Sequence, residues 1–412
     1  MYLTHLALTD FRLFTRLDQD VPRRIVLLVG NNAQGKTSLL EAIYYLATFT
    51  SFHAQNDRQL IHFAAAERPQ GVARLVADYV RGTKKHHLEV RLIQELNGAG
   101  TPPRFRKEIL LDGVKRNASD AIGHFNAVIF LPQMTRIIEN GPEERRRYLN
   151  LALSQALPGY AQALSEYQQA LTQRNALLKL LGERSERMGG DLDQLNFWDD
   201  LIARRGAQLM LARILAIRDL ERLAARIHTR LTHAGEVLRL VYQPAYEPLP
   251  QPNGQISLPI LTPVDRSGLS LEQIQEGFCQ RLKDLRSEEI MRGMTTIGPH
   301  RDEMRCLSNG IDLGDYGSRG QIRTALLALK LAEVAWMKEK TGHSPVLLLD
   351  EILAELDIQR RQDLLEALYE SEQGLLTTTD IKLFAEDFSN RATLWEVQAG
   401  AVRQLGLNAG GG

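Results

Sequence analysis

Cysteine is scarce in this sequence, with only Cys279 and Cys306 among 412 residues. Two isolated thiols exclude a disulfide framework and a cysteine-rich zinc centre, and they suit a reducing compartment. Long apolar runs are also missing, so no segment is predicted to cross a membrane. The N-terminal residues show no charged segment followed by an apolar one, which argues against a secretory signal peptide. We therefore expect a cytoplasmic protein of two or three domains.

The sequence also lacks an excess of charge of either sign, because 50 basic residues balance 50 acidic ones and the net charge is zero. This balance argues mildly against a protein that coats nucleic acid. The basic residues are unevenly distributed, however: residues 81–116 contain nine lysines and arginines and four acids. A local basic face of this kind is typical of nucleic-acid binding. The candidate DNA contacts are Lys84, Lys85, Arg104 and Arg106; a solvated hairpin face is the alternative interpretation.

A glycine-rich segment carries the clearest chemistry. Residues 30–37 read GNNAQGKT, which matches the phosphate-binding pattern G-x-x-x-x-G-K-[ST] at every position, between a predicted strand and a predicted helix. The glycines allow backbone N–H groups to surround a phosphate, Lys36 neutralises its oxygens, and Thr37 offers a hydroxyl to Mg²⁺. The predicted ATP contacts are Gly30, Asn31, Asn32, Ala33, Gln34, Gly35, Lys36, Thr37 and Ser38.

A second segment, Val346–Glu351, reads as a buried strand that ends in two acids. Asp350 is predicted to hold Mg²⁺, and Glu351 to act as the general base on water, while Lys36 supports catalysis through the phosphate. Paired acids at this point indicate the ABC-type branch of P-loop proteins. That branch requires a signature segment upstream, and residues 316–323 (YGSRGQIR) supply one.

The signature segment is predicted to open a helix whose first residues face a γ-phosphate. Ser318, Gly320 and Gln321 are its candidate ATP contacts, and a simple helix cap at Ser318 is the alternative. Asp357, just past the acidic strand, fits the loop that crosses the dimer interface in this class.

The chain is predicted to be an α/β protein with an ABC-type P-loop ATPase head of mixed and parallel sheets, interrupted by a helical-hairpin arm. Strands are expected in residues 1–30 and 72–130, with a turn at Asp112-Gly113. Leucines and tyrosines at helical spacing between Tyr160 and Leu181 predict a seam with a partner helix. The expected domains are the N-terminal part of the head at 1–140, the arm at 141–294, the C-terminal part of the head at 295–405, and a tail at 406–412.

The order of these motifs resembles the RecF family of recombination-repair ATPases. Besides the P-loop and the acidic strand, the resemblance rests on Phe11-Arg12, GPEERRRYLN (141–150), GPHRDE (298–303) and LLLDEILAELD (347–357). It implies ATP and Mg²⁺ as cofactors, an ATP-dependent homodimer, and slow hydrolysis stimulated by DNA. It also implies binding to duplex DNA and to junctions of single- and double-stranded DNA at gaps, and work with RecR and RecO in loading recombinase.

Some positions depart from the family pattern or have more than one interpretation. Residues 131–134 read LPQM, and Gln133 is either the metal- and water-contacting glutamine of ABC proteins or a polar loop residue. His300 and Arg301 are expected to support the phosphate site, to line a DNA surface, or to form structural ion pairs. Arg12 is expected to approach the nucleotide, and Arg145–Arg147 are expected either to contact DNA or phosphate or to form a solvated helix start.

Other classes fit less well. Structural-maintenance ATPases have far longer coiled-coil arms, ABC transporter subunits usually carry a histidine where this chain reads Thr377-Thr378-Thr379, and ATPases of the overcoming-lysogenization type need an appended nuclease domain. Another SMC-like or ABC-type DNA-associated ATPase remains the alternative function.

Overall fold

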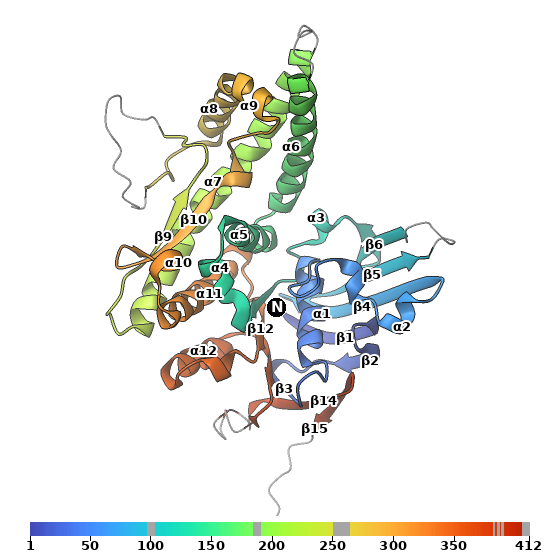
Figure 1. Ribbon diagram of the computed structural model, residues 1–412. Helices are drawn as coiled ribbons and strands as arrows, with labels where there is room; N and C mark the ends of the chain where they lie inside the picture. The colour runs from blue at the N-terminus through green and yellow to red at the C-terminus, as the bar shows by residue number, and fades with distance from the viewer. Residues whose placement is uncertain are drawn as a thin grey trace, which may run out of the picture. The chain divides into compact units, whose positions relative to one another are not determined.

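The computed structural model describes residues 1–96, 104–183, 191–249, 264–381, 384, 388 and 391–405. The chain forms two compact units. The first, here called the head unit, comprises Met1–Met134 and Glu333–Gly412; the second, the arm unit, comprises Thr135–Ala332. Figure 1 follows both units along the chain.

One sheet of the head unit is antiparallel, with the strand order β2-β1-β4-β5-β6-β7. Its strands are β1 (Tyr2–Phe11), β2 (Phe14–Asp20), β4 (Gln70–Arg81), β5 (Lys84–Glu95), β6 (Arg104–Leu111) and β7 (Val114–Arg116). The predicted turn between β6 and β7 is confirmed, because Asp112 and Gly113 have φ values of 50° and 78°. Positive φ at both positions is the requirement of a type I′ hairpin turn.

The second sheet of the head unit has the order β15-β14-β3-β13-β12-β8, and all neighbours but the β14–β15 pair are parallel. Its strands are β3 (Arg24–Val29), β8 (Ala127–Phe130), β12 (Val346–Asp350), β13 (Gln373–Thr378), β14 (Thr393–Gln398) and β15 (Ala401–Leu405). The central strands are continuous apolar runs, because a parallel sheet is covered on both faces. Parallel register brings the carboxyl ends of β3, β12 and β13 to one edge, where the P-loop begins and the acidic strand ends.

Helix α1 (Lys36–Thr48) packs against strands of both sheets and shares one hydrophobic core with them. Nearly all of its side chains are buried, including the charged Lys36 and Glu41, so the helix lies inside the core rather than on its surface. Further helices described in the head unit include η1 (Asp57–Leu60), α2 (Phe63–Ala66), α3 (Ala118–Ala121), η2 (Pro132–Thr135, which ends at the boundary), η4 (Ile352–Glu355) and α12 (Ile358–Glu370).

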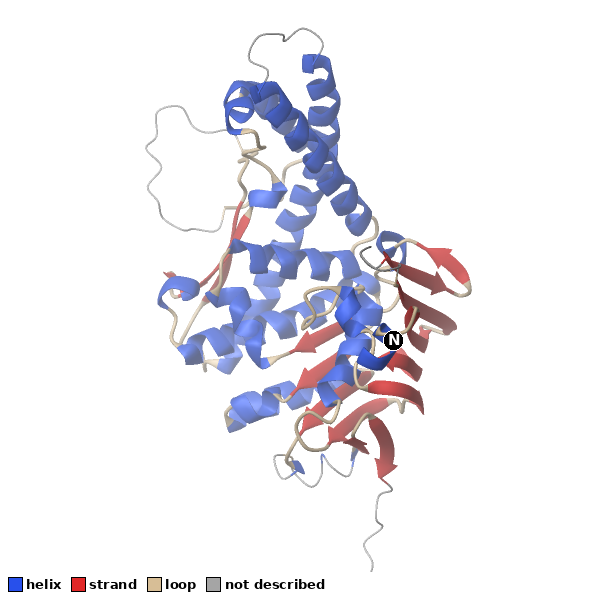
Figure 2. Cartoon of the chain, turned by 45° about the vertical axis from the view of Figure 1, so that its right-hand side comes forward, coloured by secondary structure: helices blue, strands red, loops and turns tan. Residues whose placement is uncertain are grey.

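Helices dominate the arm unit, as Figure 2 shows. They are α4 (Arg136–Glu139), α5 (Pro142–Ala156), α6 (Tyr160–Glu183), α7 (Asp191–Leu231), α8 (Leu271–Asp284), α9 (Arg286–Arg292), η3 (Pro299–Arg301), α10 (Leu313–Tyr316) and the first part of α11 (Arg319–Thr341). Helices α6 and α7 pack along each other and form the predicted hairpin. At 1.5 Å per residue α7 is about 60 Å long.

The seam of α6 contains one charged residue, Arg174, whose role was not visible in the sequence. Its side chain is fully buried and binds Asp199 of α7 at 2.7 Å and Glu289 of α9 at 2.6 Å. Thr295 Oγ1 lies 2.8 Å from the same guanidinium. The gap in the apolar seam is therefore filled by an ion-pair network that joins three segments of the arm.

A three-stranded sheet in the arm unit was not predicted. It has the order β11-β10-β9 and consists of β9 (Leu238–Gln243), β10 (Glu303–Ser308) and β11 (Ile311–Asp312). Residues 295–332, which include β10 and its pairing with β9, belong to the arm unit, whereas the sequence assigned 295–405 to the head. The units therefore divide at Ala332 rather than at residue 294, and at Met134 rather than at residue 140.

Two parts of the predicted organisation lie outside the described residues: the turn of the helical hairpin and the tail 406–412. Among the helices of the described residues, none is long and apolar enough to cross a membrane.

Candidate nucleotide site

The P-loop connects β3 to α1 and contains two positions at which the backbone favours glycine. Gly35 has a φ of 110°, and Ala33 a φ of 62°. A Cβ atom at Gly30 would lie 2.4 Å from the Val397 carbonyl oxygen, too close for any side chain. The two glycines of the motif are therefore required by the local geometry as well as by phosphate binding.

Lys36 lies at the first position of α1 and reaches back over the loop. Its Nζ donates to the carbonyl oxygens of Gly30 at 2.6 Å and Asn31 at 3.1 Å. The same ammonium lies 3.4 Å from Glu351 Oε1. The catalytic pair named from the sequence, Lys36 and Glu351, is thus brought together from positions more than 300 residues apart.

Thr37, Asp350 and Thr377 form the centre of the site. Thr37 Oγ1 donates to the Asp350 carboxylate at 3.0 Å, and Thr377 Oγ1 donates to Asp350 Oδ1 at 2.8 Å. Burial raises the pKa of the Asp350 carboxyl, and the hydrogen bonds from Thr377 and Thr37 offset part of that rise. A hydroxyl facing a buried carboxylate presents the hard oxygen donors that Mg²⁺ prefers, so these residues fit the metal.

Glu351 follows Asp350 in left-handed backbone, with a φ of 49°. Its N–H donates to Thr377 Oγ1 at 2.9 Å, which fixes the turn, while 41% of its side chain is exposed. A non-glycine residue with positive φ at a strand end is unusual and often marks a functional site. Thr377, which holds both acids, was missed as a site residue; its position at the end of β13, the neighbour of β12, was the available signal.

The other predicted residues of the P-loop lie where the motif places them. Asn31, Asn32 and Ala33 are exposed, and Gln34 and Ser38 are half-buried. Gln34 is anchored by the β14–β15 turn, because Ala399 N donates to its Oε1 at 2.7 Å and Gly400 N to its carbonyl oxygen at 3.1 Å. This support from the C-terminal hairpin had no signal in the sequence.

Gln133 lies just beyond β8, next to the acidic strand. The parallel register pairs Leu349 of β12 with Phe130 of β8, so both strands end at the same edge. Gln133 follows this edge by three residues and is half-buried. This position agrees with either interpretation made from the sequence.

The signature residues lie in the arm unit, at the start of α11. Ser318 and Gly320 are exposed. Ser318 Oγ accepts a hydrogen bond from Gln321 N at 3.3 Å, and Gln321 Oε1 accepts one from Ser318 N at 3.0 Å. This reciprocal pair is a capping box, so Gln321 orders the helix start on which Ser318 sits.

Arg12 pairs with α1. Its guanidinium binds the Glu41 carboxylate through two hydrogen bonds of 2.8 Å, and its Nη1 donates to the Gln59 carbonyl oxygen at 3.2 Å. Ser51 Oγ also donates to Glu41. The structure thus gives Arg12 a buried carboxylate partner next to the P-loop helix.

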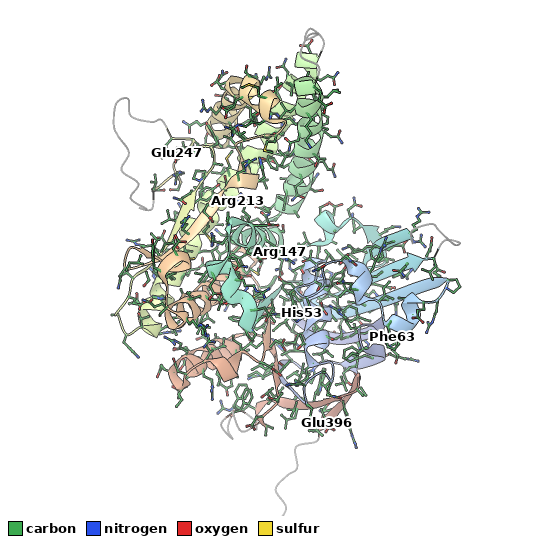
Figure 3. The ribbon with its side chains drawn as sticks, in the orientation of Figure 1. His53, Phe63, Arg147, Arg213, Glu247 and Glu396 are labelled. Carbon is green, nitrogen blue, oxygen red and sulfur yellow. The ribbon has the colours of Figure 1, made fainter. Side chains whose placement is uncertain are left out.

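The GPHRD segment connects parts of the arm unit. Asp302 is buried and accepts hydrogen bonds from Arg213 at 2.8 Å, from Tyr242 Oη, and from Ala245 N at 2.9 Å. Arg213, labelled in Figure 3, projects from α7 and also donates to the Pro299 carbonyl oxygen at 2.5 Å. The segment therefore ties α7 to the arm sheet.

His300 and Arg301 have structural partners as well. Tyr167 Oη lies 2.7 Å from His300 Nδ1, and burial lowers the pKa of His300 to about 4. Arg301 Nε donates to the Thr295 carbonyl oxygen at 3.1 Å. Of the arginines at 145–147, Arg145 binds Glu303 at 2.7 Å and Arg146 donates to the Asp302 carbonyl oxygen at 3.0 Å.

The four candidate DNA contacts do not form one cluster. Lys84 and Lys85 open β5, whereas Arg104 and Arg106 of β6 pair with Glu95 and Ile93 at its far end. The eight residue steps from Lys85 to Ile93 span about 27 Å at about 3.4 Å per step. All four side chains are exposed, and Arg106 lies 3.4 Å from Glu95. The basic segment therefore provides two separate patches on one sheet.

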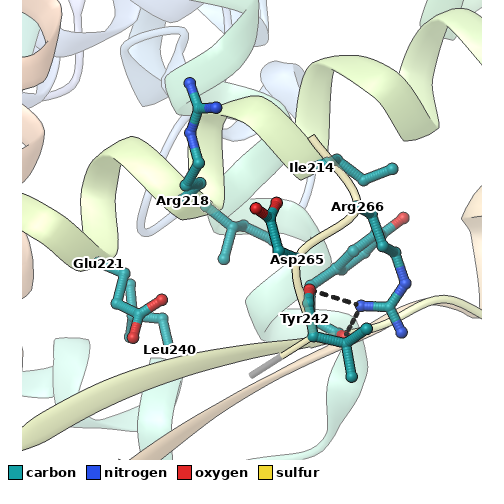
Figure 4. A pocket seen from close by; sticks show the side chains of 9 residues that line it. Ile214, Arg218, Glu221, Leu240, Tyr242, Asp265 and Arg266 are labelled. Atoms are coloured by element: carbon teal, nitrogen blue, oxygen red, sulfur yellow. Dashed lines mark hydrogen bonds between the residues drawn. The ribbon is translucent and has the colours of Figure 1, made fainter. Parts of the chain in front are cut away.

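A cavity of about 180 Å³ lies in the arm unit, between α7 and β9. Its lining consists of Ile214, Ile217, Arg218, Glu221, Leu240, Tyr242, Val264, Asp265 and Arg266 (Figure 4). The Arg266 guanidinium is occupied by Glu247 at 2.9 Å and by the Tyr242 carbonyl oxygen at 3.3 Å. None of the nucleotide motifs contributes to the described lining of this cavity.

The head, with its P-loop and acidic strand, defines an ATPase of the class shared by RecF, RecN and SMC proteins, and the RecF/RecN/SMC N-terminal domain model matches residues 2–399. The DNA replication and repair protein RecF of Roseiflexus castenholzii is 39% identical over 97% of the chain and 99% of its own length. The RecF protein of Enterococcus faecalis is 31% identical over 98% of the chain and 99% of its own length.

Solved structures agree with these sequence matches. Two structures of the recombination mediator protein RecF in the RecFOR pathway, one with ATPrS and one with ATP, each give a TM-score of 0.79. They are 29% and 28% identical to the chain, and each match covers 98% of the chain and at least 97% of the solved one. The chain therefore belongs to the RecF family, whose curated members here are DNA replication and repair proteins. The fold class expected from the sequence is confirmed.

Proposed function

We propose that the chain is an ATP-dependent DNA-binding protein of recombinational repair and replication restart. The observation that carries this proposal is the convergence of Lys36, Thr37, Asp350 and Glu351 within hydrogen-bonding or ion-pair distance. Two relatives of known structure, RecF with ATP and RecF with ATPrS, support ATP as the nucleotide.

In this proposal the P-loop residues 30–38 hold the phosphates of ATP through backbone N–H groups and the Lys36 ammonium. Thr37 and Asp350 hold Mg²⁺, with Gln133 as a further ligand from the neighbouring loop. When bound, the metal neutralises charge on the β- and γ-phosphates. Glu351 orients the attacking water and accepts its proton as general base. Hydrolysis is slow, and DNA stimulates it.

The exposed start of α11 supports a composite site. Ser318 and Gly320 are both exposed, and among the described residues a Cβ at Gly320 would approach only Ser318 Oγ, at 4.0 Å. A helix start with exposed N–H groups suits a phosphate. We propose that this surface meets the γ-phosphate bound by a second copy, with Asp357 in the crossing loop, so that ATP closes a homodimer.

The closed dimer holds duplex DNA, including junctions with single-stranded DNA at gaps, and works with RecR and RecO. The support for these partners is the RecFOR pathway in which the related RecF proteins act. The exposed cations Lys84, Lys85, Arg104 and Arg106 are candidate contacts to the DNA backbone, which is recognised through phosphate charge.

The test is nucleotide-dependent assembly on DNA. With ATP and Mg²⁺ the purified monomer should become a dimer that retains a gapped duplex, whereas ADP should leave it monomeric. Lys36→Ala should weaken ATP binding about a hundredfold or more, because a cation that neutralises phosphate charge is removed. Wild-type ATP affinity in Lys36→Ala, or equal assembly with ADP, would refute the proposal.

A further inference from the structure

Glu236 lies in the turn between α7 and β9, and its carboxylate contacts the signature segment. Its Oε1 accepts a hydrogen bond from Gln321 Nε2 at 3.1 Å. Gln321 is the residue whose other amide atom, Oε1, accepts the N–H of Ser318. Both ends of the Gln321 amide are therefore occupied, one by the signature serine and one by Glu236.

This arrangement fixes the orientation of the amide. A flipped Gln321 would place its NH₂ group against the Ser318 N–H and its oxygen against the Glu236 carboxylate. Both contacts would be repulsive, because donor would face donor and acceptor would face acceptor. Glu236 thus selects the one orientation of Gln321 that completes the capping box on Ser318.

Glu236 is itself held firmly. Its Oε2 accepts a hydrogen bond from Ser308 Oγ at 2.8 Å and lies 3.8 Å from Nε2 of the buried His228, in the last turns of α7. The next residue is fixed from both sides, because Val237 N donates to Asn309 Oδ1 at 2.9 Å and Asn309 N donates to the Val237 carbonyl oxygen at 3.0 Å. All of these residues belong to the arm unit.

We propose that Glu236 is a positioning residue for ATP-driven dimerisation: it connects the end of the arm helix α7 through Gln321 to Ser318. The inference rests on the proposed function, in which Ser318 meets the γ-phosphate bound by a second copy. Glu236 does not contact that phosphate. It holds the serine hydroxyl and the first N–H groups of α11 in the arrangement that the phosphate requires. Less conformational entropy is therefore lost when the dimer closes.

The experiment measures two affinities of the full chain. The affinity of the monomer for ATP is measured with a fluorescent ATP analogue, and the affinity of one ATP-bound monomer for a second copy is measured by light scattering. Glu236→Ala should leave the ATP affinity within about twofold of wild type and weaken dimerisation about tenfold, which is the effect of removing one charge-assisted hydrogen bond. Glu236→Gln should fall between wild type and alanine, because glutamine has one acceptor oxygen where the carboxylate has two, and that oxygen can face either Gln321 or Ser308.

Two control variants separate positioning from general support of the fold. Ser308→Ala removes the bond to the other carboxylate oxygen, and Glu221→Ala removes a different arm glutamate, which pairs with Arg239 at 3.0 Å. Each should leave dimerisation within about threefold of wild type, whatever its effect on the melting temperature.

A double-mutant cycle with Gln321→Ala gives the decisive readout. If Glu236 acts through Gln321, adding Glu236→Ala to Gln321→Ala should weaken dimerisation by less than about twofold more. Additive effects in the cycle, or wild-type dimerisation of Glu236→Ala, would overturn the inference. Failure of the wild-type chain to dimerise with ATP would instead overturn the proposed function.

Discussion

At the scale of single residues, the Asp350 carboxylate is held by two threonine hydroxyls, one from the P-loop and one from β13. Thr377 serves two purposes, since its Oγ1 donates to Asp350 and accepts the Glu351 N–H. Glu351, the proposed general base, and Asp350, the proposed metal ligand, thus share one hydroxyl. Removal of that hydroxyl should disturb both acids together.

Thr377→Val should therefore reduce ATP turnover about tenfold or more and destabilise the protein by about 1–3 kcal/mol, because two buried hydrogen bonds are removed. Thr378→Val is the matched control. Thr378 is equally buried, and its hydroxyl donates to the Asp380 carbonyl oxygen at 2.9 Å and accepts from Asp380 N at 3.1 Å, away from Asp350. Steady-state hydrolysis and urea unfolding measure the two effects. Equal turnover in the two variants would contradict this role of Thr377.

His300 gives the arm unit a dependence on pH. Burial lowers the pKa of its imidazole from 6.5 to about 4, so the folded arm binds this proton less readily than the unfolded chain does. The stability due to neutral His300 is fully present above pH 6.5 and is lost as the pH falls from there toward 4. The decrease amounts to at most about 3 kcal/mol at 1.36 kcal/mol per unit.

His300→Gln removes this titration while keeping a hydrogen-bond acceptor for Tyr167. Between pH 6.5 and pH 4 the variant should lose less unfolding free energy than wild type does, as measured by urea titrations across that range. His233→Gln, on an exposed turn residue, should follow the wild-type profile. If the His300→Gln profile is as steep as that of wild type, another group carries the acid dependence.

At the scale of elements, the sequence predicted those whose signals are local. Strand β3, helix α1 and strand β12 follow from apolar runs and from the P-loop pattern, and the β6–β7 hairpin follows from Asp112-Gly113. The arm hairpin follows from apolar spacing in α6, although Arg174 interrupts it. The partners of Arg174, 25 and 115 residues away, depend on tertiary packing and could not be read from one helix.

Other elements were missed for the same reason. The arm sheet is built from β9 and β10, which are separated by about 60 residues, and no local pattern indicates that they pair. The support of Gln34 by the β14–β15 turn likewise joins residues 365 positions apart. At the candidate site, Lys36, Thr37, Asp350 and Glu351 could be predicted because their motifs are short, whereas Thr377 belongs to no recognised pattern.

The separation of the basic patches on β5 and β6 makes a test at the scale of elements possible. Reversing Lys84 and Lys85 to glutamate changes one patch, and reversing Arg104 and Arg106 changes the other. If both touch duplex DNA, each double variant should weaken binding and reduce the slope of affinity against salt by about two, because two phosphates are no longer neutralised by the protein. Titrations at several salt concentrations measure both quantities. A patch whose reversal leaves affinity and slope unchanged lies outside the DNA surface.

At the scale of the whole molecule, the nucleotide motifs fall into different units. The P-loop and the acidic strand belong to the head unit, and the signature segment begins in the arm unit. The proposed composite site, which two copies of the chain build together, accounts for the presence of both halves in each chain. In such a composite site, a single chain binds ATP, whereas closure of the dimer requires two chains. A variant can therefore lose one of these steps and keep the other.

Light scattering with ATP and Mg²⁺ on two variants tests this separation most directly. Ser318→Arg leaves the P-loop intact and should bind ATP as a monomer, but the guanidinium would occupy the place of the γ-phosphate contact and block the dimer. Glu351→Gln keeps Thr37 and Asp350 and should close a dimer that persists, since no base remains to orient water. A dimeric Ser318→Arg protein, or a monomeric Glu351→Gln protein, would show that ATP is handled within a single chain.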